Sequence, residues 1–376
     1  MKILFFILFF YLNFSNLYAI DSKAEQAIVM DYNTDEVLFE KNANAIVQPA
    51  SLTKIMTVYV VFDRLKNSNL SINDTCLISA KAYRMGGSKT FLEIDERVTV
   101  NDLLRGIIIQ SGNDASIAIA ECLAGTEEDF ANLMNIYSKN LGLENTNFVN
   151  ASGWPNENHY SSVKDIAILS NELIRNFPEL YSYFSEKQFT YNNIKQPNRN
   201  KLLNNVLGAD GLKTGYLKSS GWGIAGSAIR NNRRITVVIN GTNSSRSRLN
   251  ESTNLINWAF TQTTQKKLLS KNQIIKNVDV WLGNKTTVNL IVEEDIISTV
   301  SFDQIKTINS KIEYSKPLSA PFKAGDEKGK IIISISGKPD MIIPLVVDKT
   351  VNNINPIFKS FAAIKYLIFG NTLDEL

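Results

Sequence analysis

The 376-residue sequence is poor in the residues on which many hydrolases and metalloenzymes depend. It has one histidine, His159, and no G-x-S-x-G motif, which argues against a Ser-His-Asp hydrolase. A single histidine also argues against the common catalytic zinc sites. We therefore expect His159 to lie at the surface or to have a structural role in a loop, and we expect neither a metal nor a cofactor.

Cysteine and net charge are also scarce. Two cysteines, Cys76 and Cys122, are too few for a disulfide framework in a chain of this length, although they can form one bond in an oxidising compartment. Cys122 lies on the apolar side of an expected helix, which favours a buried free thiol. The net charge of +3 is too small to indicate nucleic-acid binding, and a composition of 44% hydrophobic and 20% charged residues is typical of globular proteins.

The N-terminus predicts export. Lys2 is followed by the apolar run "ILFFILFFYL" and then by a small residue, Ala19, an arrangement typical of a secretory signal peptide over residues 1–19. Leu17 is large for its position before the cleavage site, so an uncleaved anchor remains the alternative. In either case the body of the protein is exported.

Residues 20–265 have the pattern of an α+β domain. Expected helices alternate with hairpin-linked strands, which favours an antiparallel sheet with flanking helices. The strand-like runs are "QAIVMDY", "EVLFEKN", "GWGIAGSAI" and "RITVVINGT". One helical run starts at Leu52. The others are "VNDLLRGIIIQ", "DASIAIAECLAG", "TEEDFANLMNIYSKNLG" and "ESTNLINWAF".

The pattern changes from about residue 275. Residues 275–350 contain short alternating runs separated by Gly, Pro and Asn, which predicts a small all-β domain such as a sandwich. Beyond it, Ile357, Phe361, Ile364 and Ile368 recur with helical spacing. We expect residues 354–370 to form an amphipathic helix that lies on a membrane surface, because the stretch is too short to span a bilayer; packing on the protein's own core is the alternative.

A lysine occupies an unusual position in "SLTKIMTVYVVF". The apolar residues are so dense that the expected helix is buried nearly all round, yet Lys54 lies in its first turn. Ser51 is three residues earlier, so the hydroxyl and the amine share one face. Alone, this pattern is more often a helix cap and a lysine that reaches solvent.

Two further motifs strengthen the pattern. Ser111, Gly112 and Asn113 fall in a loop between two apolar helices, and Lys213, Thr214 and Gly215 lie at a strand edge. Each tripeptide is weak alone. The order Ser-x-x-Lys, Ser-x-Asn, Lys-Thr-Gly is the set found in penicillin-binding proteins and class A β-lactamases.

The sequence therefore resembles the low-molecular-mass penicillin-binding proteins, the serine-type D-alanyl-D-alanine carboxypeptidases. The resemblance covers nearly the whole mature chain, and it includes the loop "SGWPNENHYSS", the β-rich segment and the terminal helix. It implies a β-lactamase/DD-peptidase-like fold and removal of the terminal D-alanine from peptidoglycan stem peptides. It also implies covalent inhibition by β-lactams, and a periplasmic enzyme attached peripherally to the inner membrane.

The chemistry explains the residue types. A serine is a weak nucleophile without a nearby base. Burial disfavours the ammonium form of a lysine, so Lys54, beside Lys213, is expected to accept the proton of Ser51. The resemblance implies that Ser111 relays a proton to the leaving amine and that Asn113 holds the substrate's amide side.

Substrate recognition is expected from the second half of the domain. The resemblance implies that Lys213 and Thr214 meet the terminal carboxylate, with Arg248 as a further partner and Arg246 as the competing choice. The backbone N–H groups of the nucleophilic serine and of Tyr216 are expected to form the oxyanion hole.

The sequence allows three alternative interpretations, two of them based on short patterns. Glu172 and Asn176 have the spacing of the deacylating pair of class A β-lactamases, although both fit the solvated face of a helix. The run "GWGIAG" matches a dinucleotide-binding fingerprint, but its flanks predict a closely packed strand. An inactive, membrane-tethered protein that binds cell-wall peptides is a third possibility, disfavoured because such a binder needs neither Ser51 nor Lys54. The sequence is equally compatible with carboxypeptidase and endopeptidase action.

Overall fold

The computed structural model describes residues 20–355, 360 and 364. This part of the chain divides into two compact units. The first comprises residues 20–30, 39–232 and 236–258, and the second comprises residues 31–38, 233–235 and the described residues from 259 onward. The expected signal peptide at 1–19 and nearly all of the expected terminal helix at 354–370 lie outside the described residues.

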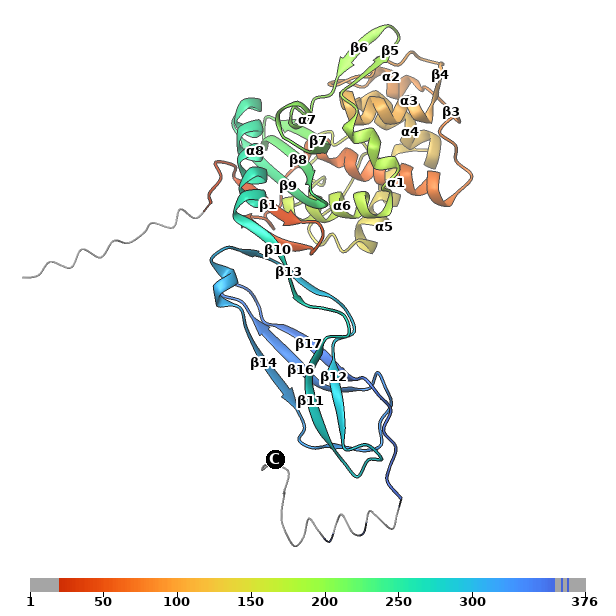
Figure 1. The fold of residues 1–376 in the computed structure, drawn as a ribbon. Coiled ribbons are helices and arrows are strands. Elements are labelled where there is room, and N and C mark those ends of the chain that lie inside the picture. Colours follow the sequence, from red (N-terminus) through yellow and green to blue (C-terminus); the bar gives the residue numbers. More distant parts are fainter. Residues whose placement is uncertain (1–19, 356–359, 361–363, 365–376) are drawn as a thin grey trace, which may run out of the picture. The chain divides into compact units, whose positions relative to one another are not determined.

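A five-stranded sheet organises the first part of the chain. Its strand order is β2-β1-β9-β8-β7, and the β7–β8 pair is antiparallel. Figure 1 shows α8 on one side of β7, β8 and β9 and the other helices on the opposite side. The strands are β1 (Gln26–Asp31), β2 (Glu36–Lys41), β7 (Ala209–Leu217), β8 (Gly221–Arg230) and β9 (Arg233–Thr242). The antiparallel sheet with flanking helices was correctly predicted, and the run "GWGIAG" lies in β8.

The helical layer contains five helices of twelve or more residues among the described residues: α1 (Lys54–Asn67), α4 (Asn113–Ala124), α5 (Glu127–Asn140), α6 (Val163–Asn176) and α8 (Ser245–Gln262). The shorter helical pieces are η1 (Ala50–Thr53), α2 (Ala80–Arg84), α3 (Val100–Arg105), η2 (Gly106–Gln110), η3 (Leu180–Ser185) and α7 (Leu202–Asn205). Helix ends follow local sequence. Thr126 caps α5 by accepting a hydrogen bond from the backbone N–H of Asp129, as threonine commonly does at a helix start.

Two hairpins turn on Asn-Asn pairs. Asn231 and Asn232, between β8 and β9, both have positive φ, as the tight two-residue hairpin turn requires. Asn192 and Asn193 do the same between β5 (Gln188–Tyr191) and β6 (Ile194–Pro197), a hairpin that the sequence analysis missed. A third small pair, β3 (Thr75–Leu77) with β4 (Arg97–Thr99), is antiparallel.

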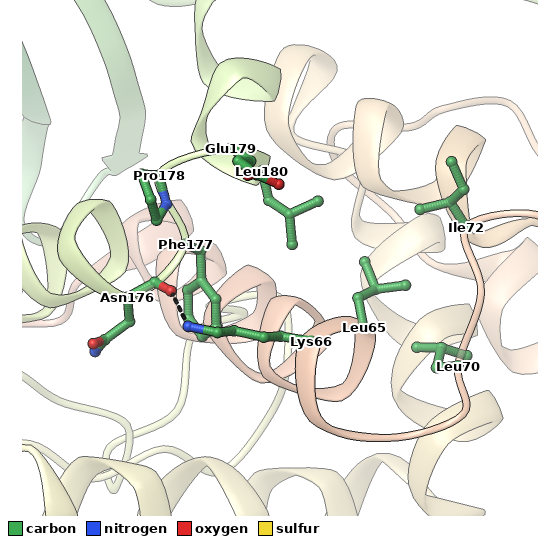
Figure 2. Close-up of a pocket in the computed structure, with 9 residues that line it drawn as sticks. All are labelled: Leu65, Lys66, Leu70, Ile72, Asn176, Phe177, Pro178, Glu179 and Leu180. Carbon is green, nitrogen blue, oxygen red and sulfur yellow. Dashed lines mark hydrogen bonds between the residues drawn. The ribbon is translucent and has the colours of Figure 1, made fainter.

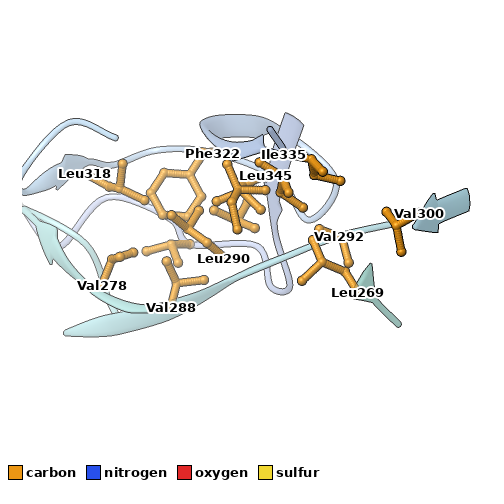
Figure 3. Close-up of a cluster of buried hydrophobic side chains, with 14 residues drawn as sticks. Leu269, Val278, Val288, Leu290, Val292, Val300, Leu318, Phe322, Ile335 and Leu345 are labelled. Atoms are coloured by element: carbon orange, nitrogen blue, oxygen red, sulfur yellow. The ribbon is translucent and has the colours of Figure 1, made fainter. Parts of the chain in front are cut away.

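The second unit is predominantly β. Its six-stranded sheet has the order β14-β16-β17-β12-β11-β15, and β10 pairs with β13. The strands are β10 (Thr263–Leu269), β11 (Ile274–Trp281), β12 (Thr287–Ile291), β13 (Ile296–Ser301), β14 (Asn309–Tyr314), β15 (Leu318–Ser319), β16 (Glu327–Ser334) and β17 (Met341–Val347), with η4 (Gln304–Thr307) between β13 and β14. Its core is a cluster of valine, leucine, isoleucine and phenylalanine side chains (Figure 3). The all-β character of this part of the chain was correctly predicted.

The expected free thiol was wrong. Cys76 of β3 and Cys122 of α4 form a disulfide. Cys76 is buried, but Cys122 is exposed, because the buried part of α4 ends at Ala120 and the last turn leaves the core. Among the described helices, none has both the length and the apolar character needed to cross a bilayer.

Candidate active site

The Ser-x-x-Lys motif lies where η1 passes into α1. Ser51 is in η1 and Lys54 is the first residue of α1, so the side chains share one face, and Lys54 Nζ lies 3.2 Å from Ser51 Oγ. The turn that presents Ser51 begins at Ala50, which has a positive φ of 51°. Gly153 makes this geometry possible, because a Cβ there would lie 1.8 Å from the carbonyl oxygen of Ala50.

Lys54 is a buried amine. It is 0% exposed, and besides Ser51 it contacts Asn113 Oδ1 at 2.8 Å and the carbonyl oxygen of Ser152 at 2.5 Å. Desolvation, reinforced by the charge of Arg199, lowers the pKa of Lys54 to about 7. A lysine with this pKa exchanges its proton near neutral pH.

The Ser-Gly-Asn loop joins η2 to α4. Ser111 has left-handed backbone angles, is 2% exposed, and its Oγ has no hydrogen-bond partner within the described part of the chain. Buried hydroxyl groups are nearly always paired, so this Oγ is available to a ligand. Asn113 is fixed at both ends of its amide, since Nδ2 donates to the carbonyl oxygen of Gly86 at 2.9 Å while Oδ1 contacts Lys54.

The Lys-Thr-Gly motif lies in β7, next to η1. Lys213 is 2% exposed, and desolvation together with the nearby charges of Lys54, Arg199 and Arg248 holds its pKa well below its usual value. Gly215 allows the strand to approach η1, because a Cβ there would lie 3.1 Å from the carbonyl oxygen of Pro49.

Arg248 projects from the first turn of α8 and is 6% exposed. Its guanidinium lies over the ring of Trp222, 5.3 Å from the ring centre. Its hydrogen bonds to the carbonyl oxygens of Gly215 and Gly223 are long, 3.4 and 3.5 Å. Burial lowers the pKa of Arg248 to about 10, so the group is still a cation at neutral pH.

Two alternatives to Arg248 as the partner of the substrate carboxylate are that Arg248 is purely structural and that Arg246 is the cation of the site. Glu251, three residues further along α8, accepts hydrogen bonds from Ser22 Oγ at 3.0 Å and from the backbone N–H of Lys23 at 2.9 Å rather than from Arg248. Arg246, the competing cation, is exposed. The fold therefore directs Arg248 into the site.

One cavity of about 510 Å³ brings the motifs together. Its lining consists of Ser51, Ser88, Gln110, Ser111, Pro197, Asn198, Arg199, Lys201, Thr214, Gly215, Tyr216, Trp222, Ser245 and Arg248. Of the residues expected at the site, five line it directly, and Lys54, Asn113 and Lys213 do not. Lys54 and Asn113 are nevertheless joined to it through the contacts of Lys54 with Ser51 and Asn113.

Arg199 and Trp222 were missed. Arg199 follows β6, and burial lowers its pKa. No local motif singles it out, because it reaches the site only through the β5–β6 hairpin. Trp222 lies opposite Tyr216 in the β7–β8 register, with ring centres 4.2 Å apart, so strand pairing was the signal that could have found it.

His159 has a structural role, as expected. Its Nδ1 accepts a hydrogen bond from the backbone N–H of Val149 at 3.1 Å, so Nε2 carries the proton and donates to Thr53 Oγ1 at 2.7 Å. Burial lowers the pKa of His159 to about 4, which leaves it neutral near pH 7.

The pair Glu172 and Asn176 lies elsewhere. Asn176 lines a separate cavity of about 440 Å³ at the end of α1, which is mostly apolar (Figure 2). In it, Lys66 Nζ donates to the backbone carbonyl of Asn176 at 2.9 Å. Glu172 instead contacts Arg175 and Asn176 within α6. Neither residue lines the cavity that contains Ser51, so the pair is not placed to deacylate an enzyme bound there.

Comparison with known proteins agrees with this geometry. Residues 14–243 match the family described as D-alanyl-D-alanine carboxypeptidase, and residues 264–353 match the penicillin-binding protein 5 C-terminal domain. The chain belongs to the D-alanyl-D-alanine carboxypeptidase family.

Relatives within this family are similar over most of their length. The D-alanyl-D-alanine carboxypeptidase DacC of Escherichia coli (strain K12) is 39% identical over 86% of this chain and 83% of its own. The crystal structure of penicillin binding protein 5 from Haemophilus influenzae is 36% identical, with a TM-score of 0.79 over 89% of this chain and 99% of that chain. Penicillin-binding protein D2 of Listeria monocytogenes, solved in an ampicillin-bound form, is 30% identical, with a TM-score of 0.59 over 65% of this chain and 100% of that chain.

The chain is thus a serine-type, penicillin-binding D-alanyl-D-alanine carboxypeptidase of low molecular mass. The β-lactamase and the inactive binding protein are not favoured.

Proposed function

We propose that the protein removes the terminal D-alanine from peptidoglycan stem peptides through an acyl-enzyme on Ser51, with Lys54 as the general base. The observation that carries this proposal is the buried Lys54 amine 3.2 Å from Ser51 Oγ. Lys54 is the one titratable group in hydrogen-bond contact with that hydroxyl among the described residues, and its pKa of about 7 suits a base that acts near neutral pH.

The three contacts of Lys54 suit both of its protonation states. As an ammonium, Nζ donates to Ser51 Oγ and to the oxygens of Asn113 and Ser152. As a neutral amine it has two N–H groups, which the two carbonyl oxygens accept. Its lone pair then faces Ser51, whose O–H donates to it, and this is the arrangement required to take the proton.

The reaction then follows in two steps. Ser51 Oγ attacks the carbonyl carbon of the penultimate D-alanine while its proton passes to Lys54, and the backbone N–H groups of Ser51 and Tyr216 stabilise the oxyanion. Ser111 relays a proton to the leaving amine, the C–N bond breaks, and D-alanine departs, with Asn113 holding the amide side of the substrate. Water then hydrolyses the ester and restores the Ser51 hydroxyl.

The terminal carboxylate of the substrate is bound by Lys213, Thr214 and Arg248. Thr214 and Arg248 line the cavity, and the charges of Lys54 and Arg248 both act on the buried amine of Lys213. A buried guanidinium with only long hydrogen bonds retains N–H capacity for a carboxylate. The cluster therefore favours a free chain end over a continuing amide.

The experiment on this proposal measures D-alanine release and labelling together. The purified protein should release D-alanine from a D-Ala-D-Ala peptide, and a β-lactam should add its mass to the chain, as its strained amide mimics the scissile bond. Ser51→Ala should abolish both, while Ser182→Ala, at an exposed serine, should change neither. A β-lactam adduct that persists in Ser51→Ala by intact-mass spectrometry would disprove the assignment.

We also propose that the protein is periplasmic and is attached to the membrane surface through residues 354–370. The support is the sequence: an apolar stripe of Ile357, Phe361, Ile364 and Ile368, flanked by lysines that can meet lipid headgroups. Truncation after Asn353 should give an active enzyme that no longer sediments with anionic lipid vesicles. Phe361→Glu in the full chain should weaken sedimentation as well, and continued pelleting of the truncated protein would contradict the anchor.

A further inference from the structure

Two buried carboxylates, Asp114 and Glu127, are near enough to the Lys54 amine to affect its charge. Asp114 follows the Ser-Gly-Asn loop at the start of α4 and is 1% exposed, and Glu127 begins α5 and is also buried. Neither lines the cavity that contains Ser51. Their roles follow from what each one holds.

Asp114 fixes the segment that orients Asn113. Its carboxylate accepts hydrogen bonds from the backbone N–H groups of Thr90, Phe91 and Leu92, at distances from 2.8 to 3.4 Å. The residues just before this segment, Gly86 and Ser88, supply carbonyl oxygens that accept hydrogen bonds from Asn113 Nδ2 at 2.9 Å and from the Asn113 backbone N–H at 2.7 Å. With Nδ2 bonded to Gly86, Asn113 presents Oδ1 to Lys54 at 2.8 Å.

Glu127 fixes the other acceptor of Lys54. Its Oε1 accepts a hydrogen bond from the backbone N–H of Ala151 at 3.1 Å, while Thr57 Oγ1 donates to the carbonyl oxygen of Ala151 at 2.7 Å. The backbone N–H and carbonyl of Ala151 are therefore both hydrogen-bonded. The next carbonyl along the chain, that of Ser152, is the one that Lys54 contacts. Each carbonyl acceptor of the amine is thus positioned by one buried carboxylate.

We propose that Asp114 and Glu127 are positioning residues for the reaction, which hold the two acceptors of Lys54 and stabilise the ammonium that forms when Ser51 gives up its proton. This inference rests on the proposed role of Lys54 as the base. It resembles the role of the aspartate in a Ser-His-Asp triad, which orients the base and stabilises its charged form without contacting the substrate.

The charges around Lys54 agree with the geometry. Asp114 and Glu127 raise its pKa, against the lowering by burial and by Arg199. The charged or titratable groups that face Lys54 from the surrounding elements are Asp114 of α4, Glu127 of α5, Lys213 of β7, Arg199 after β6 and His159 before α6. Of these only the two carboxylates favour the ammonium, because Arg199 is a cation, Lys213 adds no negative charge and His159 is neutral. Glu127 also forms an ion pair with Lys81 Nζ of α2 at 2.7 Å.

The test is the pH dependence of kcat/KM for a D-Ala-D-Ala peptide. Activity should rise with pH as Lys54 loses its proton, with a midpoint near 7. Loss of one facing negative charge lowers the pKa of Lys54, so in Asp114→Asn and in Glu127→Gln this midpoint should move down by roughly 0.5 to 1 pH unit. The plateau rate should fall as well, because the base is weaker and its acceptors are less well held.

Two further variants separate charge from stability. Asp114→Glu keeps the charge, so its midpoint should remain at the wild-type value even if the rate falls. Asp165→Asn is the matched control: Asp165 is buried and accepts hydrogen bonds from the backbone of Asn145 and from Thr146 Oγ1, but it does not face Lys54. It should lower the unfolding temperature and leave the midpoint unchanged.

The outcomes are distinct. Midpoints that stay at the wild-type value in Asp114→Asn and Glu127→Gln overturn the inference, whatever happens to rate or stability. If Asp114→Asn does not fold, the midpoint of Glu127→Gln is compared with that of Asp165→Asn, and an unchanged midpoint in Glu127→Gln overturns the inference. A wild-type profile without a midpoint near 7 contradicts Lys54 as the base, and then the proposed role of Lys54 fails together with this inference, whereas D-alanine release and the labelling of Ser51 are tested separately.

Discussion

Replacement of Arg248 by alanine tests how the enzyme recognises the end of a chain. In the free protein the guanidinium is buried over Trp222, and its hydrogen bonds to the carbonyl oxygens of Gly215 and Gly223 and to Ser245 Oγ are all long, 3.4 to 3.5 Å. Within the described residues it forms no ion pair, and Glu251 is engaged with Ser22 and the backbone of Lys23. Its charge therefore remains available to a ligand in the cavity.

The expected magnitude follows from that contact. A hydrogen bond to a charged group contributes about 1.5 to 3 kcal/mol, which corresponds to a loss of roughly 10- to 150-fold in kcat/KM. The lower half of this range is expected, because Lys213 and Thr214 remain beside the carboxylate. A peptide amidated at its C-terminus has no charge to pair, so the same variant should lose at most a few-fold on it.

The assay compares kcat/KM for the free-acid and the amidated D-Ala-D-Ala peptide in each variant. Arg246→Ala, two residues away on α8 and exposed, is the matched control and should change neither value. Arg248→Lys keeps the charge without the planar fork and should retain part of the preference for the acid. An equal loss on both substrates would refute the reasoning and leave Lys213 as the partner of the carboxylate.

Two further predictions concern stability. Lys54→Met should be inactive yet more stable than wild type below pH 7, because the pKa of Lys54 is near 10.5 in the unfolded chain and about 7 in the folded protein. Burial of the charged amine therefore lowers the free energy of unfolding of the wild type by up to about 5 kcal/mol. The cost of leaving two carbonyl oxygens unpaired in the variant reduces this difference, which is fully present below pH 7 and disappears as the pH rises to 10.5. Denaturant titrations at pH 6 and pH 10 measure this, and equal differences at both would contradict it. Reduction of Cys76–Cys122, which closes a loop of 46 residues, should lower the free energy of unfolding by about 4 kcal/mol, measured with and without reductant; an unchanged midpoint would count against it.

The sequence predicted what local spacing controls. Ser51 and Lys54 are three residues apart, and any helical turn places them on one face. The alternation of apolar residues after 275 likewise predicted strands, since the side chains of a strand alternate between faces. Neither inference required knowledge of distant contacts.

Features that arise from contacts between distant segments were not predictable in this way. Arg199 lies 145 positions after Lys54, and its place in the cavity depends on a hairpin whose short, polar strands carry little hydrophobic pattern. The disulfide depends on how α4 leaves the core after Ala120, a property of packing rather than of helical period. The carboxylate of Asp114 is part of an ordinary helix start in the sequence, and only the fold brings three backbone N–H groups to it.

The cations of the site explain why recognition and chemistry are linked. Burial lowers the pKa of each member of the group Lys54, Lys213, Arg199 and Arg248, and none of them forms an ion pair within the described chain. The charge of another member lowers the pKa of Lys54, Lys213 and Arg248 further. Their mutual repulsion opposes folding and lowers the pKa of Lys54 toward neutrality. In the proposed reaction, the substrate carboxylate enters beside Lys213 and Arg248 and offsets this repulsion as the scissile carbonyl reaches Ser51. The free-acid peptide should therefore stabilise the Ser51→Ala protein against heat more than the amidated peptide does, because only the acid supplies the missing negative charge.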